Sequence, residues 1–416
     1  MTTATAPFPI SRRGLLAGSA AGFAMMTAPG LIRPAHAQAE TIRVGFPVPL
    51  TGPFSAEAKD QVRAAELAVR QFNDAGGLNG RKAELLVRDD TLKPAVAAQV
   101  TLELIEKERV HFLVGSLGAS VQLAINEVAK ARGVLFNSIS QSDAINEAKD
   151  FSRFTFHEGL TPHVTTGAVA RHVFKPGQKV AFLTADYAFG HEAVRGFRRA
   201  GEKAGIVVLD DVRHPFGTAD FSAYTEKIAT LKPDVLCVCN FGKDQLNAIQ
   251  ALSDEGLKET FRIVVPVLLY NQCVAGGPDL YEGVVGGCNY HWTLEETLPS
   301  ARAFNDAYRA ANGGAVPSDY GAYGYGGVRT VLEAVKRAGS TDTDKVIAEM
   351  ERLRYDFYKG PQHFRACDHQ SVQSVLVVSA RKKAAMRNPQ DIFEILATDQ
   401  PDEANLRTCS ELGLST

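Results

Sequence analysis

The residues with the clearest capacity for chemistry lie in the turn from Gly115 to Ser120, GSLGAS, between an apolar run and a stretch with helical periodicity. Its hydroxyl groups, its free backbone N–H groups and the positive end of the helix favour an anion, either a phosphate or a carboxylate. The turn lacks the third glycine of G-x-G-x-x-G, and the chain contains no G-x-x-x-x-G-K-[ST], so a nucleotide is not expected. Capping of the helix by Ser116 and Ser120 is the alternative role of the two hydroxyl groups.

A carboxylate site is the prediction, because charge-assisted hydrogen bonds contribute about 1.5 to 3 kcal/mol each and need no buried Arg or Lys. The loop after the next apolar run, NSISQS, offers further donors. The predicted carboxylate-binding residues are Ser116, Leu117, Gly118, Ser138, Ser140 and Gln141.

Aromatic and aliphatic residues gather in a second group of loops. Such side chains form an apolar pocket around the body of a ligand whose polar end is held elsewhere. Each residue alone fits a protein core equally well, and their concentration in equivalent loops favours the pocket. The predicted wall comprises Phe54, Asp186, Tyr187, Phe189, Phe241, Leu268 and Tyr270.

Motifs of catalysis are missing from the sequence. It contains no G-x-S-x-G elbow, no H-E-x-x-H, and no Cys–His pair with a local signature. Its ten histidines are scattered and form no metal-ligand cluster. We therefore expect a binding protein without catalytic residues, metal or cofactor, and not an enzyme.

The elements that position these loops are strands alternating with helices. This order predicts an α/β protein with two similar parallel-sheet units, each covered by helices, and ligands bind such sheets beyond the carboxyl ends of the strands. A helical stretch at residues 300–353 and a strand-like run at 371–382 are not placed by pattern alone. The strand-like runs cover residues 41–46, 82–87, 111–115, 133–137, 179–186, 205–211, 234–240, 262–268 and 283–290.

Composition excludes several classes of protein. The 416 residues are 45% hydrophobic and 22% charged, which is ordinary globular composition with enough chain for two domains. The net charge of −2 gives no basic surplus for nucleic acid or an anionic membrane. Small solutes and protein partners remain.

The N-terminus has the features of a signal peptide. Arg12-Arg13 precedes an apolar run, and Ala35-His36-Ala37 is typical of a cleavage site, so residues 1–37 are predicted to be removed. The SRRGLL start resembles a twin-arginine signal. An anchoring helix is the alternative, but Gly, Ser and Pro interrupt the run. We expect a soluble protein exported to the periplasm.

Six cysteines would then lie in an oxidising compartment, where disulfides form. Cys367 and Cys409 flank the C-terminal segment and are the favoured pair, and Cys273 with Cys288 is a weaker candidate. Cys237 and Cys239 fall within one apolar run and are predicted to be buried and unpaired.

A resemblance to the periplasmic binding proteins of the leucine, isoleucine and valine type covers nearly the whole mature chain. It is carried by the stretches VPLTGPFSAEAKDQVRAAELAVRQFNDAGGLNGRKAELLVRDD, FLVGSLGASVQLAINEVAKARGVLFN, ADYAFGHEAVRGFRRAGEKAGIVV and DFSAYTEKI. The resemblance implies a type I fold with two lobes, three crossovers and a hinge that closes on the ligand. It places residues 38–160 with 295–368 in lobe 1, and residues 161–294 with 369–416 in lobe 2.

The resemblance also implies roles for residues and partners. The loop after the third strand would hold the ligand carboxylate through Ser116 and the backbone of Leu117 and Gly118, helped by residues 138–141. The partners would be a small-molecule ligand and an ABC permease with its ATPase, and a monomer is expected.

The ligand class follows from a departure in lobe 2. Amino-acid binders of this family commonly place an acidic residue after the fourth lobe 2 strand, where this chain has Pro266 to Tyr270 without an acid. An ammonium against that wall would be desolvated without a partner. The sequence thus favours a small hydrophobic or aromatic carboxylate. The alternatives are a branched-chain amino acid paired with Asp186, and a sensory receptor lobe.

Overall fold

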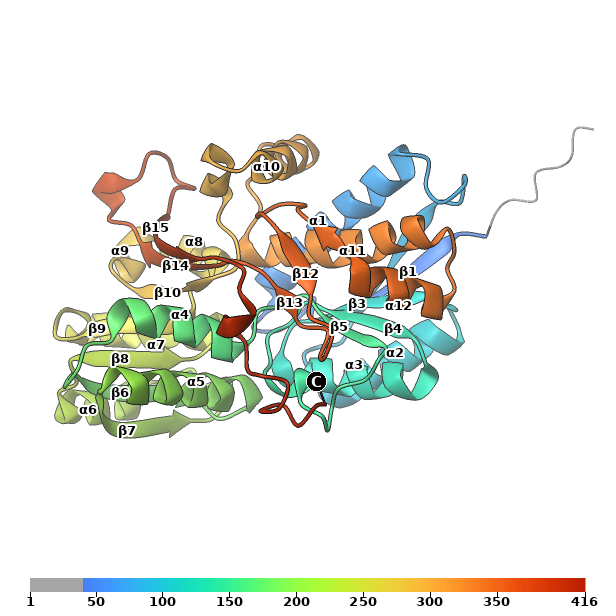
Figure 1. Ribbon diagram of the computed structural model, residues 1–416. Coiled ribbons are helices and arrows are strands. Elements are labelled where there is room, and N and C mark those ends of the chain that lie inside the picture. Colours follow the sequence, from blue (N-terminus) through green and yellow to red (C-terminus); the bar gives the residue numbers. More distant parts are fainter. Residues whose placement is uncertain (1–39, 416) are drawn as a thin grey trace, which may run out of the picture. The chain divides into compact units, whose positions relative to one another are not determined.

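The structure, a computed structural model, describes residues 40–415. The predicted signal peptide lies outside these residues. The first strand in the described part of the chain is β1 (Ile42–Val48). β1 is buried along nearly its whole length, as expected of a strand between two helical layers. It belongs to a parallel sheet of order β2-β1-β3-β4-β5 (Figure 1). The other strands are β2 (Ala83–Asp89), β3 (Phe112–Gly115), β4 (Leu135–Ser138) and β5 (Thr155–His157).

Helices cover both faces of this first sheet because its strands alternate apolar side chains between the faces. In β3, Phe112 and Val114 join one apolar cluster, whereas Leu113 joins the cluster formed with α2 and α3. Helices α1 and α11 pack against each other, and α11 also contacts β3 and β4. The helices are α1 (Ser55–Asp74), α2 (Pro94–Glu106), α3 (Ala119–Arg132) and α11 (Asp319–Ala338).

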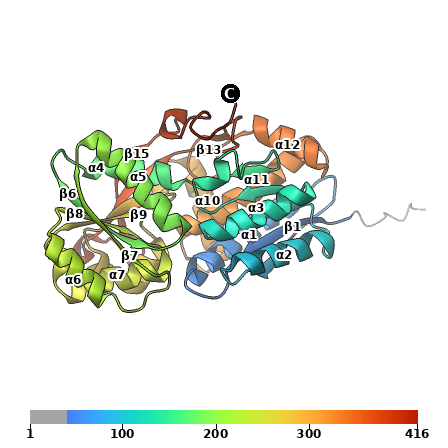
Figure 2. The same ribbon diagram turned by 90° about the horizontal axis from the view of Figure 1, so that it is seen from below.

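The second sheet has seven strands in the order β15-β14-β10-β9-β8-β6-β7. Strands β6 to β10 are parallel, and β14 is antiparallel to both of its neighbours. The bounds are β6 (Lys179–Ala185), β7 (Val207–His214), β8 (Val235–Cys239), β9 (Arg262–Val267), β10 (Val285–Cys288), β14 (Val375–Ala380) and β15 (Phe393–Asp399). Its helices include α4 (Pro162–Val173), α5 (Ala188–Ala204), α6 (Ser222–Leu231) and α7 (Gly242–Asp254), labelled in Figure 2. The others are α8 (Tyr270–Gly276) and α9 (Pro278–Tyr281), labelled in Figure 1.

The chain passes between the two sheets three times: after β5, after β10 and before β14. The predicted α/β fold with two similar lobes and three crossovers is thus confirmed. We call the bodies built on the first and second sheets lobe 1 and lobe 2, and the exact lobe boundaries stay a prediction. Between the last two crossings lie α10 (Pro299–Ala311), α11, α12 (Thr343–Arg352) and a small antiparallel sheet of β11 (Arg354–Tyr355), β12 (Gln362–Phe364) and β13 (Ser371–Val372).

The run at 371–382, which the sequence predicts as one strand, forms two. β13 joins the small sheet and β14 joins the second sheet, because the chain crosses between them at Gln373 and Ser374. None of the helices in the described part of the chain combines the length and the hydropathy that a membrane-spanning segment needs.

The favoured disulfide, Cys367–Cys409, is present, with a Cα–Cα distance of 6.2 Å. The weaker candidate was wrong, because Cys273 and Cys288 are free and buried. Cys237 and Cys239 are also free and buried, as predicted.

Candidate functional site

A cavity of about 10 Å³ lies beyond the carboxyl ends of strands from both sheets. Parallel sheets bind ligands at this edge. The volume is far below the roughly 300–1,000 Å³ of pockets that hold drug-sized ligands, so a ligand enters only when the walls move apart. Lining residues are Phe54, Leu117, Gly118, Ala119, Ser140, Gln141, Tyr187, Phe189, Phe241 and Tyr320, none of which carries a formal charge at neutral pH.

The N-terminus of α3 faces the cavity through Gly118 and Ala119. No side chain caps this helix. The first N–H groups of a helix have no partner within it, so they are donors with a partial positive charge. Gly118 has a φ of 104°, and a Cβ atom there would lie 2.9 Å from Leu92 Cδ1, so the turn requires glycine.

Ser140 and Gln141 supply polar side-chain atoms to the same cavity. Both residues are buried, and Ser140 Oγ, Gln141 Nε2 and Gln141 Oε1 have no hydrogen-bond partner in the protein. A buried polar group left unpaired costs about 1 to 3 kcal/mol. These atoms are therefore available for a ligand.

Aromatic rings form the rest of the wall. Phe241, directly before α7, packs edge to face on Phe54 at 4.6 Å between ring centroids, on Tyr320 at 5.3 Å and on Phe189 at 5.8 Å. Phe54 and Tyr320 come from the start of α1 and α11, on the other sheet. Burial, and then the charges of Asp244 and Glu192, raise the pKa of Tyr187, so its hydroxyl is protonated at neutral pH.

The structure brings eight of the predicted residues together around this cavity: Phe54, Leu117, Gly118, Ser140, Gln141, Tyr187, Phe189 and Phe241. The other five predicted residues do not line it.

The hydroxyl groups of Ser116 and Ser138 point to protein partners. Ser116 Oγ donates to Asp90 Oδ2 at 3.1 Å, and burial raises the pKa of Asp90 to about 6. Ser138 Oγ donates to Gln122 Oε1. Both serines are fully buried. The two side chains do not line the cavity and instead connect the loops that carry the cavity residues. Their contact with a ligand stays a prediction.

Three predicted wall residues also lie elsewhere. Asp186 is exposed, with Oδ1 2.7 Å from His191 Nε2. Leu268 is buried in the apolar core of lobe 2, and the Tyr270 hydroxyl donates to Gln390 O at 3.5 Å. They do not line the cavity, because side-chain direction in a loop does not follow from its place after a strand. Their contact with a ligand stays a prediction.

Sequence reasoning missed Ala119 and Tyr320. Ala119 lies within the predicted turn, directly after the residues predicted to bind the carboxylate. Tyr320 starts a helix from the far end of the chain, and the pairing of α11 with α1 brings it to the cavity. The run SDYGAYGYGG carried an N-cap signal at Ser318 but no sign of a ligand.

Two buried acids near the cavity were also missed. Glu57 Oε1 accepts from Gln272 Nε2 of lobe 2 at 2.8 Å, and Asp319 Oδ1 accepts from Tyr270 N at 3.4 Å. Burial raises the pKa of Glu57 to about 7 and raises that of Asp319 well above its ordinary value. Glu57 Oε2 and Asp319 Oδ2 have no partner in the protein.

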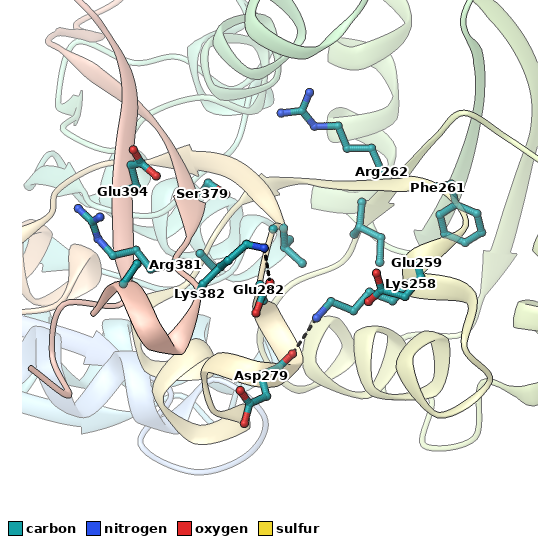
Figure 3. Close-up of a pocket in the computed structure, with 15 residues that line it drawn as sticks. Lys258, Glu259, Phe261, Arg262, Asp279, Glu282, Ser379, Arg381, Lys382 and Glu394 are labelled. Carbon is teal, nitrogen blue, oxygen red and sulfur yellow. Dashed lines mark hydrogen bonds and ion pairs between the residues drawn. The ribbon is translucent and has the colours of Figure 1, made fainter. Parts of the chain in front are cut away.

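A larger hollow, of about 570 Å³, lies at the opposite edge of the second sheet (Figure 3). It adjoins the amino-terminal ends of β9 and β10 and is lined by four basic and four acidic side chains. Some of these charges have partners in the protein: Lys382 Nζ lies 3.3 Å from Glu282 Oε1, and Lys258 Nζ donates to the backbone carbonyl of Asp279 at 2.8 Å. The balanced charges select no ligand, and we do not assign a site there.

The chain matches the periplasmic binding protein family over residues 41–385, and it therefore belongs to that family. A relative, Leu/Ile/Val-binding protein homolog 3 of Brucella melitensis biotype 1, is 25% identical over 318 residues, 74% of this chain and 82% of the relative. A periplasmic binding protein from Burkholderia mallei has a TM-score of 0.81 at 27% identity, covering 89% of this chain and 97% of that one.

A third similar protein is an ABC transporter solute-binding protein from Rhodopseudomonas palustris BisB5, solved in complex with 3,4-dihydroxy benzoic acid. Its TM-score is 0.76 at 22% identity, covering 87% of this chain and 98% of that one. The protein is thus a type I periplasmic binding protein of the branched-chain amino acid type, a solute-binding component of ABC transport and not an enzyme.

Proposed function

We propose that this protein binds a small hydrophobic or aromatic carboxylate in the cavity between the lobes and delivers it to an ABC permease. The observation that carries the proposal is the composition of the cavity lining. It combines the uncapped start of α3 and the unpartnered polar atoms of Ser140 and Gln141 with a set of aromatic rings.

The start of α3 and the polar atoms of Ser140 and Gln141 suit a carboxylate. Each charge-assisted hydrogen bond to it would contribute about 1.5 to 3 kcal/mol, and the partial charge of the helix terminus favours an anion. Binding would also satisfy donors that are buried without a partner in the protein. The aromatic rings of the cavity lining suit an apolar or aromatic ligand body, since flat rings pack well in offset or edge-to-face arrangements.

Related structures support the ligand class. The similar proteins from R. palustris were solved with 3,4-dihydroxy benzoic acid and with benzoate, so this fold accommodates aromatic carboxylates in other members. Their identity to this chain is 22% in both cases, so the assignment here depends on the cavity residues.

The mechanism would be hinge closure. Lining residues come from loops of both lobes, and a ligand favours the closed form only through contacts that it makes in both at once. The lobes would be residues 38–160 with 295–368 and residues 161–294 with 369–416. The protein would act as an exported monomer in the periplasm, where the permease and its ATPase read the closed form.

A second candidate ligand is an amino acid with an apolar side chain. The observation in its favour is the pair of unpartnered oxygen atoms on Glu57 and Asp319. After burial and the neighbouring Tyr323, the charges of Asp319 and Glu57 also raise the pKa of the cavity residue Tyr320. Neither carboxyl group lines the cavity, so an ammonium would pair with one of them only after the cavity wall moves. The exposed Asp186, predicted for this role, does not line the cavity.

Thermal unfolding of residues 38–416 against a ligand panel tests the proposal. The panel contains benzoate, cinnamate and 3,4-dihydroxybenzoate, their amides, and leucine, valine and phenylalanine. A ligand at one hundred times its dissociation constant stabilises the native state by about 2.7 kcal/mol, which shifts the midpoint measurably. We expect the aromatic carboxylates to raise the midpoint of thermal unfolding and their amides to leave it unchanged. A shift by leucine or valine alone would favour the amino-acid candidate and overturn the first.

A further inference from the structure

Glu192 of α5 in lobe 2 contacts the loop after β4 in lobe 1. Its Oε1 accepts from Ser142 Oγ at 3.0 Å and from Ala144 N at 3.3 Å, and its Oε2 accepts from Asp143 N at 3.1 Å. Glu192 is 3% exposed. These donors begin the short 3-10 helix η1 (Ala144–Asn146), whose first N–H groups have no partner of their own. Glu192 therefore caps a helical turn of the other lobe.

Asp143 makes a bond in the opposite direction. Its Oδ1 accepts from His163 N, in the first turn of α4 in lobe 2, at 3.0 Å. Each of the two carboxyl groups thus accepts a backbone N–H of the other lobe. The pair joins the lobes through one loop.

The same loop also supplies polar side chains to the cavity. Ser140 and Gln141 line the cavity, and Ser142 to Ala144 directly follow them. A shift of the loop by one residue length would move both sets of groups. The position that presents Ser140 and Gln141 to a ligand is therefore the position in which Glu192 finds its three donors.

We propose that Glu192 is a positioning residue that couples ligand capture to lobe closure, because it fixes, only in the closed form, the loop that meets the ligand. The inference rests on the proposed function in one respect, the assignment of this cavity to the ligand. A contact made only in the closed form raises the ratio of closed to open protein, and the apparent affinity rises with the closed fraction.

The surroundings of Glu192 make glutamine a suitable replacement. Burial, and next the charge of Asp143, raise the pKa of Glu192. Arg195, one turn along α5, lies 4.0 Å from Glu192 Oε1. Burial raises the pKa of Asp143, and the charge of Arg407 opposes this rise. Glutamine keeps the shape and one acceptor, whereas alanine removes every acceptor.

The test measures the distance between lobes without a ligand. Spin labels on Lys93→Cys, before α2, and Glu226→Cys, in α6, occupy exposed positions on the two lobes. Pulsed electron resonance then gives the distribution of distances. We expect Glu192→Ala to raise the open fraction by about 5- to 30-fold, the factor that corresponds to the loss of a modest contact, and Glu192→Gln to raise it less.

A matched control is Glu202→Ala, which removes an exposed carboxylate from the same helix and should leave the distribution unchanged. Ser142→Ala, alone and with Glu192→Ala, completes a double-mutant cycle, in which the two effects should not add. Circular dichroism confirms that each variant folds. An unchanged distribution in Glu192→Ala, or additive effects in the cycle, would overturn the proposal.

Ligand titration separates this inference from the proposed function. If the Glu192 variants open the lobes while Ser140→Ala and Gln141→Leu leave the binding of every panel ligand unchanged, the result supports the role of Glu192 and contradicts the ligand site. If those cavity variants weaken benzoate binding while the Glu192 variants change neither the distance between the lobes nor the affinity, the ligand site is supported and the role of Glu192 is contradicted.

Discussion

Phe54 and Phe241 meet edge to face across the lobe boundary, with ring centroids 4.6 Å apart and planes at 69°. Phe54 follows β1 of the first sheet and Phe241 follows β8 of the second. Such a pair contributes about 0.5 to 1.5 kcal/mol beyond the area it buries. The apolar wall therefore also stabilises the closed arrangement, and a ligand that enters must replace this contact with its own.

The first prediction concerns Gly242, next to this pair. It has a φ of 57°, and a Cβ atom there would lie 2.6 Å from Phe54 Cδ1. Gly242→Ala should weaken ligand binding by tenfold or more, about 1.4 kcal/mol, because the clash disfavours closure. Isothermal titration measures the loss. Gly256→Ala is the matched control, since its φ is 67° with no atom within 4 Å. Equal affinities for the two variants would contradict the role of this contact.

The second prediction concerns the unpartnered polar atoms. Ser140→Ala and Gln141→Leu should each lower affinity for an aromatic carboxylate by about tenfold or more, whereas the unliganded protein should be as stable as before or more stable, by up to about 1 to 3 kcal/mol. Ser138→Ala, whose hydroxyl bonds to Gln122, should instead destabilise the protein and spare affinity. Titration and chemical unfolding measure both quantities. Loss of stability in Ser140→Ala without loss of affinity would remove this residue from the site.

The third prediction concerns the disulfide. A bond that closes a loop of 42 residues stabilises the native state by about 4 kcal/mol in the chain-entropy description. Cys367→Ser with Cys409→Ser should lower the free energy of unfolding by an amount of that order. The amide of Ala148 should exchange faster, because it donates to Leu412 O in the segment that the bond retains. A reductant should lower the free energy of unfolding of the native protein but not that of the double variant. An equal free energy of unfolding with and without the reductant in the native protein would contradict the pairing.

The fourth prediction concerns pH. Burial raises the pKa of Glu57 from 4.5 to about 7 in the folded protein. Its contribution to stability is therefore fully present below about pH 4.5 and is lost as the pH rises to about 7, a loss of about 3 kcal/mol. Glu57→Gln removes this titration, so it should stabilise the protein at pH 8 and have a smaller effect at pH 5. Urea unfolding at both values measures the difference.

Glu66→Gln is the control for this prediction, because it removes an equal charge from an exposed position on the same helix. Its stability should follow the wild-type dependence on pH. A Glu57→Gln variant that does the same would show that Glu57 ionises freely in the folded protein.

The sequence predicted the fold and the position of the cavity because both depend on chain order. Parallel strands place the loops that follow them on one edge, so Phe54, Gly118, Gln141 and Phe241 could be assigned to that edge without coordinates. The strand-like run at 371–382 was predicted as one strand but forms β13 and β14, because no local pattern indicates that the chain changes sheet within it.

Side-chain direction was the part that the sequence could not predict. Ser116 and Ser140 occupy similar loops, yet Ser116 bonds to Asp90 and Ser140 faces the cavity. Which of them turns inward depends on Asp90, a residue of a neighbouring loop that becomes buried only on folding. Tyr320 was missed for a related reason, since only the packing of α11 on α1 brings it to the site.

The packing of α11 against α1, β3 and β4 also decides how the gene can be divided. A fragment that ends near residue 160 encodes all five strands of the first sheet but lacks α11, which packs on β3 and β4, and a fragment of residues 161–294 lacks the antiparallel pair β14 and β15. No single uninterrupted stretch encodes either body with its full cover. Isotope labelling or biosensor designs that treat one body alone need a spliced reading frame, with a linker that replaces the segment of the other body.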